Sequence, residues 1–102
     1  MSWNINKSFN IVNWIEIRKT CPYKKTNVKK WYSCTYYFIN NSGGGHPFEI
    51  RSSAGGSAYN TGVTNNNGSS GAIIFHISMD TPGTLYYQCS NHSGMLGTIT
   101  IT

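Results

Sequence analysis

Short runs in which apolar and polar residues alternate make up much of this chain, and they predict strands. Residues 31–40 form the strongest run, because nearly every position is aromatic or β-branched and a turn rich in Asn and Gly follows. In residues 72–78, Ile73, Phe75 and Ile77 recur at every second position, which places them on one face of a strand. The expected strands cover residues 9–17, 31–40, 46–51, 72–78, 84–89 and 96–102. No stretch shows a convincing helical period, so the pattern predicts an all-β sandwich or barrel.

Two polar connections separate these strands. Residues 20–30 are basic and contain Cys21 followed by Pro22, and we expect an irregular loop there. Residues 52–71 are rich in Gly, Ser and Asn, and a connection of this length in a small domain is usually either functional or mobile. Tyr59 and Val63 are its sizeable apolar side chains. We therefore expect an ordered insertion that these two side chains hold in place.

Length and composition fit a single domain of residues 1–102. Charged residues make up only 11% of the chain, as suits short strands joined by turns. The formal net charge of +5 is local, because five lysines fall between Lys19 and Lys30. Such a cluster can steer an acidic partner, an anionic membrane or nucleic acid, but a solvated loop that aids solubility is the better interpretation. No RNA-binding motif is present and the tyrosines lie in the strand-like runs, so we expect no nucleic-acid partner.

The candidate chemistry lies in residues 86–97, where Cys89, His92 and Met95 follow one another in the spacing C-x2-H-x2-M. Cys with two His and a weak axial Met makes a blue-copper site, because these ligands suit both Cu(I) and Cu(II). A second His is then required, and His46, which follows three glycines, is the obvious source. The spacing predicts Cys89 at a strand end, His92 in a turn and Met95 where the next strand begins. Since His46 comes from another strand, we expect the metal to connect the two sheets.

Each of these residues has a plainer alternative. Taken alone, His46 is better interpreted as a surface turn histidine, Cys89 as an inert buried thiol and Met95 as a core side chain. Their joint spacing favours the metal site. His76 alternates with apolar neighbours, so we expect it to point outward and to bind no metal. Zinc also accepts Cys and His, so the same pocket suits zinc in a recombinant preparation.

The number of cysteines is odd, since the chain has three. At least one therefore stays outside any internal disulfide. If Cys89 is a metal ligand, Cys21 and Cys34 either pair in an oxidising compartment or remain two separate thiols. The sequence leaves both possibilities open.

Two stretches of the chain resemble the cupredoxins, small β-sandwich proteins that carry a type 1 copper. They are His46-Pro47-Phe48-Glu49-Ile50 and the run from Gly83 to Gly97, and the similarity covers roughly residues 31–102. The resemblance implies a cupredoxin-like Greek-key β-sandwich of about six to eight strands. The spacing of the ligand loop is that of the amicyanin branch. By this resemblance one copper ion has His46, Cys89 and His92 as equatorial ligands and Met95 as its axial ligand.

Two positions beside the ligands depart from the family pattern. Pro47 stands where many cupredoxins have an Asn whose backbone N–H donates to the ligand sulfur, and proline has no N–H. Because donors to the thiolate tune the reduction potential, this change bears on the potential of the site. Asn91 replaces the proline that is common in the ligand loop, and we expect a more flexible loop.

The resulting hypothesis is an electron-transfer protein that cycles between Cu(I) and Cu(II), with the edge of His92 as the route for electrons. The alternative is a non-catalytic copper-binding or structural cupredoxin module of a larger assembly. We expect no enzyme, because three histidines are too few for the additional copper cluster of a multicopper oxidase or nitrite reductase. The binuclear copper centre of cytochrome oxidase subunit II is set aside, because it needs a second Cys where Leu85 stands.

The expected partner is a redox protein with an acidic docking surface, and we expect the chain to act as a monomer. No run of about eighteen or more apolar residues occurs, which predicts no integral membrane segment. The start of the chain also lacks the basic-then-apolar pattern of a secretory signal. The family resemblance favours a periplasmic or other extracytoplasmic location, and the residues themselves leave the compartment unknown.

Overall fold

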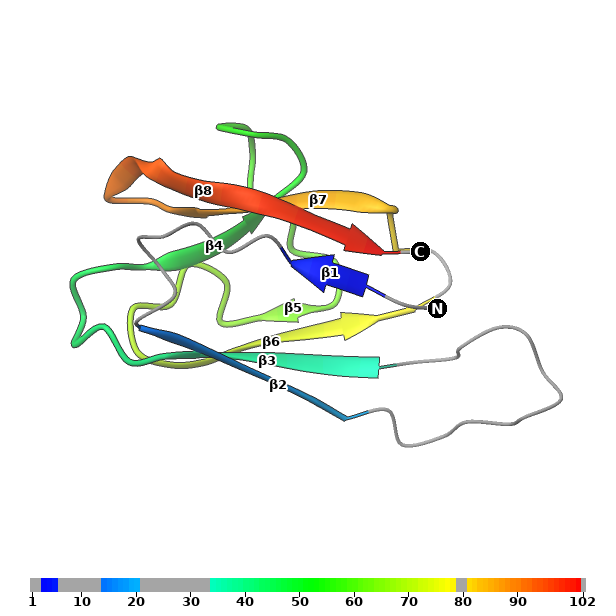
Figure 1. The fold of residues 1–102 in the computed structure, drawn as a ribbon, viewed down its shortest axis with the longest axis horizontal. Helices are drawn as coiled ribbons and strands as arrows, with labels where there is room; N and C mark the ends of the chain where they lie inside the picture. The colour runs from blue at the N-terminus through cyan, green and yellow to red at the C-terminus, as the bar shows by residue number, and fades with distance from the viewer. Residues whose placement is uncertain (1–2, 6–13, 21–33, 79–80, 102) are drawn as a thin grey trace, which may run out of the picture.

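The computed structural model describes residues 3–5, 14–20, 34–78 and 81–101, and in this part of the chain every regular element is a strand. The strands are β1 (Trp3–Ile5), β2 (Ile15–Thr20), β3 (Cys34–Asn40), β4 (Phe48–Arg51), β5 (Val63–Thr64), β6 (Gly71–Ile77), β7 (Thr84–Cys89) and β8 (His92–Ile101). They form two stacked antiparallel sheets of four strands each (Figure 1). The strand orders are β1-β8-β7-β4 and β2-β3-β6-β5. The prediction of an all-β sandwich is confirmed.

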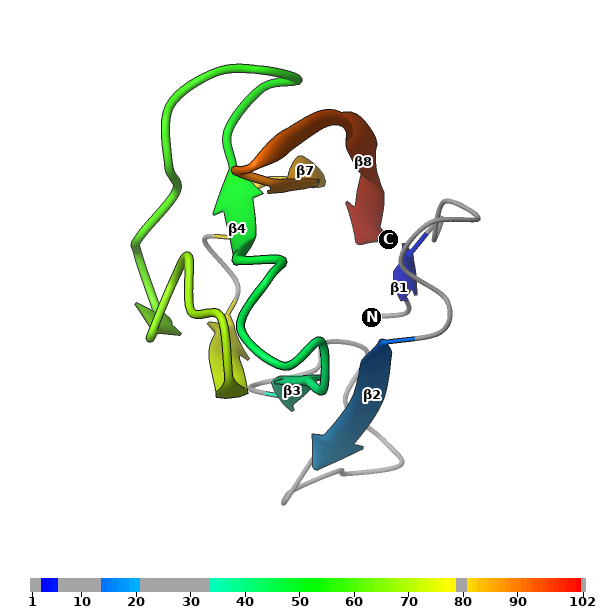
Figure 2. The same cartoon turned by 90° about the vertical axis from the view of Figure 1, so that its left-hand side faces the viewer.

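The core lies between the two sheets, and strict alternation along the strands builds it. Along β3 every second residue is buried, and the same face of β6 is buried at Ile73, Phe75 and Ile77. The ring of Phe38, in β3, stacks on that of Phe48, in β4, with centroids 5.0 Å apart, so the two sheets meet in direct aromatic contact. Each such side chain contributes about 1.5–3 kcal/mol by leaving water. Figure 2 looks along this layered core from one end.

The β7–β8 hairpin positions the residues of the candidate site. Cys89 pairs with His92 across a two-residue turn, and the next pair is Gln88 with Leu96. Residues 93–95 are therefore extra residues on the β8 side of the ladder, and they form a bulge. Bulges bend a strand and redirect its side chains, and they are common beside functional sites.

The long connection after β4 is ordered, as we expected. Tyr59 and Val63 are half-buried against the core. A third anchor was not predicted: the side-chain amide of Asn66 accepts the N–H of Ile50 at 2.7 Å and donates to the carbonyl of Ile50 at 3.1 Å. The N–H of Phe48 also donates to the carbonyl of Gly68 at 3.0 Å. The connection therefore follows the edge of β4 that faces away from β7.

The strands differ from the predicted ones at several places. β1 was not predicted, and β4 begins at Phe48 instead of His46. β2 begins at Ile15 and continues past the predicted end at Ile17 to Thr20, which was predicted to begin a loop. Residues 9–13 of the predicted strand and residues 21–30 of the predicted loop lie outside the described residues. β8 begins at His92 instead of Leu96, because the tight turn lets pairing resume at once. The two-residue strand β5 was not predicted, since its neighbours are polar and rich in turn formers.

The cysteines have different states. Cys34 is disulfide-bonded, whereas Cys89 is a free and buried thiol. Cys21 lies outside the described residues. Cys89 is thus available as a ligand.

Across the described ranges, no helix has the length and apolar character needed to span a membrane.

Candidate metal centre

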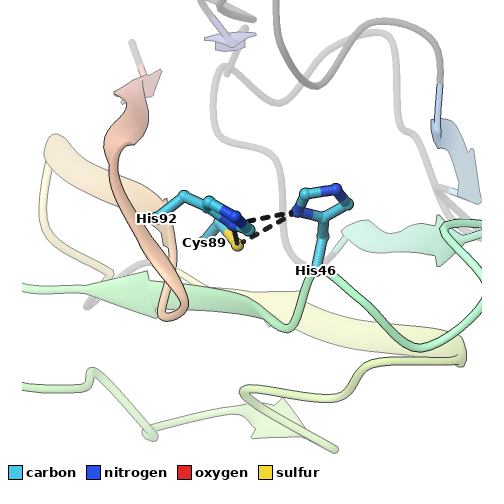
Figure 3. A group of neighbouring side chains, drawn as sticks. All are labelled: His46, Cys89 and His92. Atoms are coloured by element: carbon cyan, nitrogen blue, oxygen red, sulfur yellow. Dashed lines mark hydrogen bonds between the residues drawn. The ribbon is translucent and has the colours of Figure 1, made fainter.

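Three side chains that donate nitrogen or sulfur converge at one end of the sandwich. They are His46, from the β3–β4 connection, Cys89, at the end of β7, and His92, at the start of β8 (Figure 3). Their ligand atoms all lie within 4.8 Å of one another. The sequence predicted this grouping, and the structure brings the three residues together.

The thiol of Cys89 lies at the inner end of this cluster. Its side chain is fully buried, because β7 places Leu85, Tyr87 and Cys89 on its core face. Its partner in the ladder is Phe48, which is also fully buried. The sulfur therefore has apolar surroundings on the side of the core and the two imidazoles on the other side.

A buried asparagine fixes the backbone that carries His46. The side-chain amide of Asn40 donates to the carbonyl of His46 at 2.7 Å and to that of Gly68 at 3.1 Å. Its oxygen accepts the N–H of Ser42 at 2.9 Å, and the hydroxyl of Ser42 accepts the N–H of His46 at 3.2 Å. Asn40 is only 3% exposed, so water competes little for these bonds. The connection between β3 and β4 is thus shaped from inside before any metal binds.

Three hydrogen bonds attach the tip of the hairpin to its surroundings. The N–H of Ser90 donates to the carbonyl of Pro47 at 3.2 Å, and its hydroxyl donates to Oδ1 of Asn67 at 2.7 Å. The amide of Asn91 donates to the carbonyl of Gly45 at 3.3 Å. The side chain of Asn91 thus connects the hairpin to the glycine turn before His46. That Asn91 makes the loop more flexible than a proline would stays a prediction.

An aromatic ring closes the other side of His46. The indole of Trp14 stacks on this imidazole with ring centroids 5.0 Å apart and an angle of 15° between the planes. The ring of His92 is tilted by 46° against that of His46, with centroids 4.7 Å apart. Trp14 is buried, His46 is half-buried and His92 is exposed. Exposure thus increases from the indole to the outer imidazole.

The remaining candidates occupy different positions. Met95 lies in the bulge of β8, three residues after His92, and is half-buried against the core. Pro47 offers its carbonyl to the hairpin and has no N–H to offer to the sulfur. His76 is exposed on β6, with its Nδ1 3.1 Å from the hydroxyl of Thr35, and does not belong to the cluster. The prediction that His76 points outward is confirmed.

The distances within the cluster suit a shared metal ion. Nδ1 of His46 lies 3.2 Å from Nδ1 of His92, and Sγ of Cys89 lies 3.6 Å and 3.4 Å from these two nitrogens. Ligands that share one ion at bond lengths of about 2.0–2.3 Å lie roughly 3.2–3.8 Å apart. A thiolate with two imidazoles is a donor set for copper or zinc. The residues present therefore fit one copper ion.

The prediction that a metal would connect the two sheets was wrong. β4, β7 and β8, which carry or flank the three residues, are neighbours in a single sheet. Pairing of β4 with β7 alone brings the end of β7 beside the residues that precede β4. Contact with the other sheet comes from Trp14, just before β2, and from Asn40, at the end of β3.

Sequence reasoning missed the two residues that surround His46. Asn40 was seen only as the start of a turn signal, although a polar residue ending an otherwise apolar strand is an indication of a capping role. Trp14 was assigned to a strand. The ring of Trp14 stacks on that of His46, which lies 32 positions further along the chain (46 − 14), and no local pattern in the sequence predicts that contact.

A β-sandwich that gathers a buried Cys and two His at one end defines the class of small copper-binding sandwich proteins. The comparison with protein families agrees. Residues 11–102 match the copper-binding proteins of the plastocyanin/azurin family, and the chain belongs to that family. Neither the comparison with curated proteins nor that with solved structures finds a match.

Proposed function

We propose that this protein is a one-electron carrier whose single type 1 copper is held by His46, Cys89 and His92, with Met95 as the weak axial ligand. One observation carries the proposal: a buried thiol and two imidazoles converge to within 4.8 Å on a chain of the copper-binding plastocyanin/azurin family. Electron transfer is the usual role of this family.

Copper, when bound, supplies a couple between Cu(I) and Cu(II). The protein contributes ligands that need not move when the charge changes. Asn40 fixes the backbone of His46, and the hydrogen bonds of Ser90 and Asn91 fix the hairpin that carries Cys89 and His92. A rigid ligand set keeps the reorganisation between the two oxidation states small. The exposed imidazole of His92 is then the route between the buried ion and a partner.

The proposal assigns no catalysed reaction to the chain. A ligand set completed by four side chains leaves no open position for a substrate, whereas catalytic metal sites keep one. The partner we propose is a redox protein with an acidic docking surface, since the chain has a net charge of +5. We also propose that the chain, as a single domain, acts as a monomer.

The test is the visible absorption spectrum after addition of Cu(II), for the wild type and for Cys89→Ser. The expected result is an intense thiolate-to-copper charge-transfer band that ascorbate bleaches, that air or ferricyanide restores, and that Cys89→Ser lacks. His76→Gln is the matched control, because it removes an exposed histidine outside the cluster. This control should keep the band.

Two results would contradict the proposal in different ways. A band that persists in Cys89→Ser, or no band in the wild type, would remove Cys89 as a copper ligand. A band that appears but cannot be cycled would reject electron transfer and would favour the alternative, a copper-binding or structural module.

Replacing Met95 by Leu tests the proposed axial ligand separately from the other three. We expect Met95→Leu to keep the band and to raise the reduction potential, because a thioether donor to Cu(II) is lost.

A further inference from the structure

We propose that Trp14 is a positioning residue for the copper site, which holds the imidazole of His46 by stacking and lowers the reduction potential through that ring. The inference rests on the copper site proposed above. It concerns a side chain that binds no metal and that lies outside the β4, β7 and β8 strands of the site.

The contact between the two rings is specific in its geometry. The centroids are 5.0 Å apart and the planes differ by 15°, so the face of the indole covers the face of the imidazole. The backbone supports the same arrangement, because the carbonyl of Trp14 accepts the N–H of Asn41 at 2.9 Å. Asn41 begins the connection that carries His46. Both the backbone and the ring of Trp14 thus contact the segment that carries His46.

The burial of the two rings makes the contact effective. Trp14 is 9% exposed, so the contact is largely shielded from water. His46 is half-buried, and its Nδ1 points at the thiol of Cys89 and at His92 (Figure 3). One face of the imidazole is therefore covered by the indole while one edge faces the other ligands. Rotation of the imidazole out of the ligand position would break the stack.

The electrostatics of the stack give the direction of the effect on the potential. The face of an aromatic ring carries partial negative charge, and indole attracts cations most strongly among the aromatic side chains. An imidazole bound to Cu(II) carries more positive charge than one bound to Cu(I). The indole therefore stabilises the oxidised form more than the reduced form, which lowers the reduction potential.

The test compares Trp14→Phe and Trp14→Leu with the wild type, each loaded with copper. A cation–aromatic contact of this kind changes an equilibrium about three- to thirtyfold. In Trp14→Leu the affinity for Cu(II) should fall by about this factor more than the affinity for Cu(I). Since a tenfold change corresponds to about 59 mV for one electron, the potential should rise by roughly 30–90 mV. Trp14→Phe should lie between, because phenylalanine keeps a stacking ring with a weaker attraction for cations.

Phe75→Leu is the matched control for lost packing. Phe75 is a fully buried aromatic residue whose ring meets Tyr59 edge-on rather than a ligand, so its replacement should lower stability and leave the potential unchanged. An equal potential in wild type and Trp14→Leu, or an equal rise in Phe75→Leu, would overturn the inference. In both cases the charge-transfer band would remain, so the proposed function would survive.

A second measurement needs no copper. In NMR spectra of the metal-free protein, the ring protons of His46 should be shifted upfield by the indole. The shift should be smaller in Trp14→Phe and absent in Trp14→Leu. An unshifted His46 ring in the wild type would refute the stack itself, even if Trp14→Leu failed to fold. If the wild type showed the shift but bound no copper, the proposed function would fail and the positioning contact would stand.

Discussion

Removal of the side chain of Asn40 tests how far the protein shapes its metal site before the ion arrives. The carboxamide makes three hydrogen bonds, to the carbonyls of His46 and Gly68 and from the N–H of Ser42. In Asn40→Ala all three are lost at a position that is 3% exposed. The carbonyl of Gly68 keeps its bond from the N–H of Phe48.

The expected cost follows from these contacts. A typical intramolecular hydrogen bond contributes about 0.5–1.5 kcal/mol net, and a buried group left without its partner costs more. Three such bonds therefore amount to about 2–4 kcal/mol in the free energy of unfolding of the metal-free protein. That is a large share of the roughly 5–15 kcal/mol by which proteins are stable. Copper affinity should fall as well, because the backbone of His46 must then be ordered when the ion binds.

Urea unfolding of the metal-free protein measures this cost through the midpoint and the slope of the transition. Asn60→Ala is the matched control: Asn60 is exposed, and its side-chain oxygen accepts one bond, from Asn66 at 3.0 Å. We expect the control to cost less than about 1 kcal/mol. The reasoning is refuted if Asn40→Ala costs no more than Asn60→Ala at an unchanged slope.

Two further predictions concern the body of the sandwich. Glu49 and Arg51 form an ion pair at 2.6 Å whose side chains are only 15% and 14% exposed. Glu49→Gln should therefore lower the free energy of unfolding by about 1–3 kcal/mol, measured by thermal or urea unfolding. Glu16→Gln, in the exposed pair with Arg18, is the control and should cost less than about 0.5 kcal/mol. Equal losses would show that burial of the pair is unimportant. Burial raises the pKa of the Tyr36 phenol above its ordinary value of 10.0, so the unfolded chain loses this proton first and stability should fall as the pH rises above about 10. Tyr36→Phe should flatten that decline, and an unchanged slope of stability against pH would contradict the assignment.

Most of the residues that could be predicted from the sequence are related locally. His46 is the exception, and it was predicted because the site needs a second His. Cys89, His92 and Met95 lie within one hairpin, so their spacing already fixes which side chains can meet. Residues 34–40 could be predicted as a strand because nearly every position is aromatic or β-branched, and residues 71–77 because their apolar residues recur with a period of two. The correction at the site has the opposite character. Whether a metal joins two sheets depends on which strands pair, and pairing is a long-range property.

The environment of His46 shows the same limit in physical terms. The ring of Trp14 and the amide of Asn40 reach His46 from the other sheet, and both contacts form only once the sandwich is packed. A pattern in the sequence predicts which face of a strand is buried. It does not predict which buried group on the opposite sheet will meet a given loop. The candidate ligands were therefore accessible to sequence reasoning, and the groups that orient His46 were not.

The connection that follows β4 has a consequence for how molecules of this protein meet. The backbone of β4 on the side away from β7 is already occupied, since Phe48 bonds with Gly68 and Asn67 and the carbonyl of Ile50 accepts the N–H of Tyr59. An open strand edge is a template on which another chain can add a strand and remain bound. Here that template is closed beside the very end of the molecule where His92 is exposed. Addition of a strand from another chain is therefore blocked at this edge of β4, so contacts between molecules there depend on side chains.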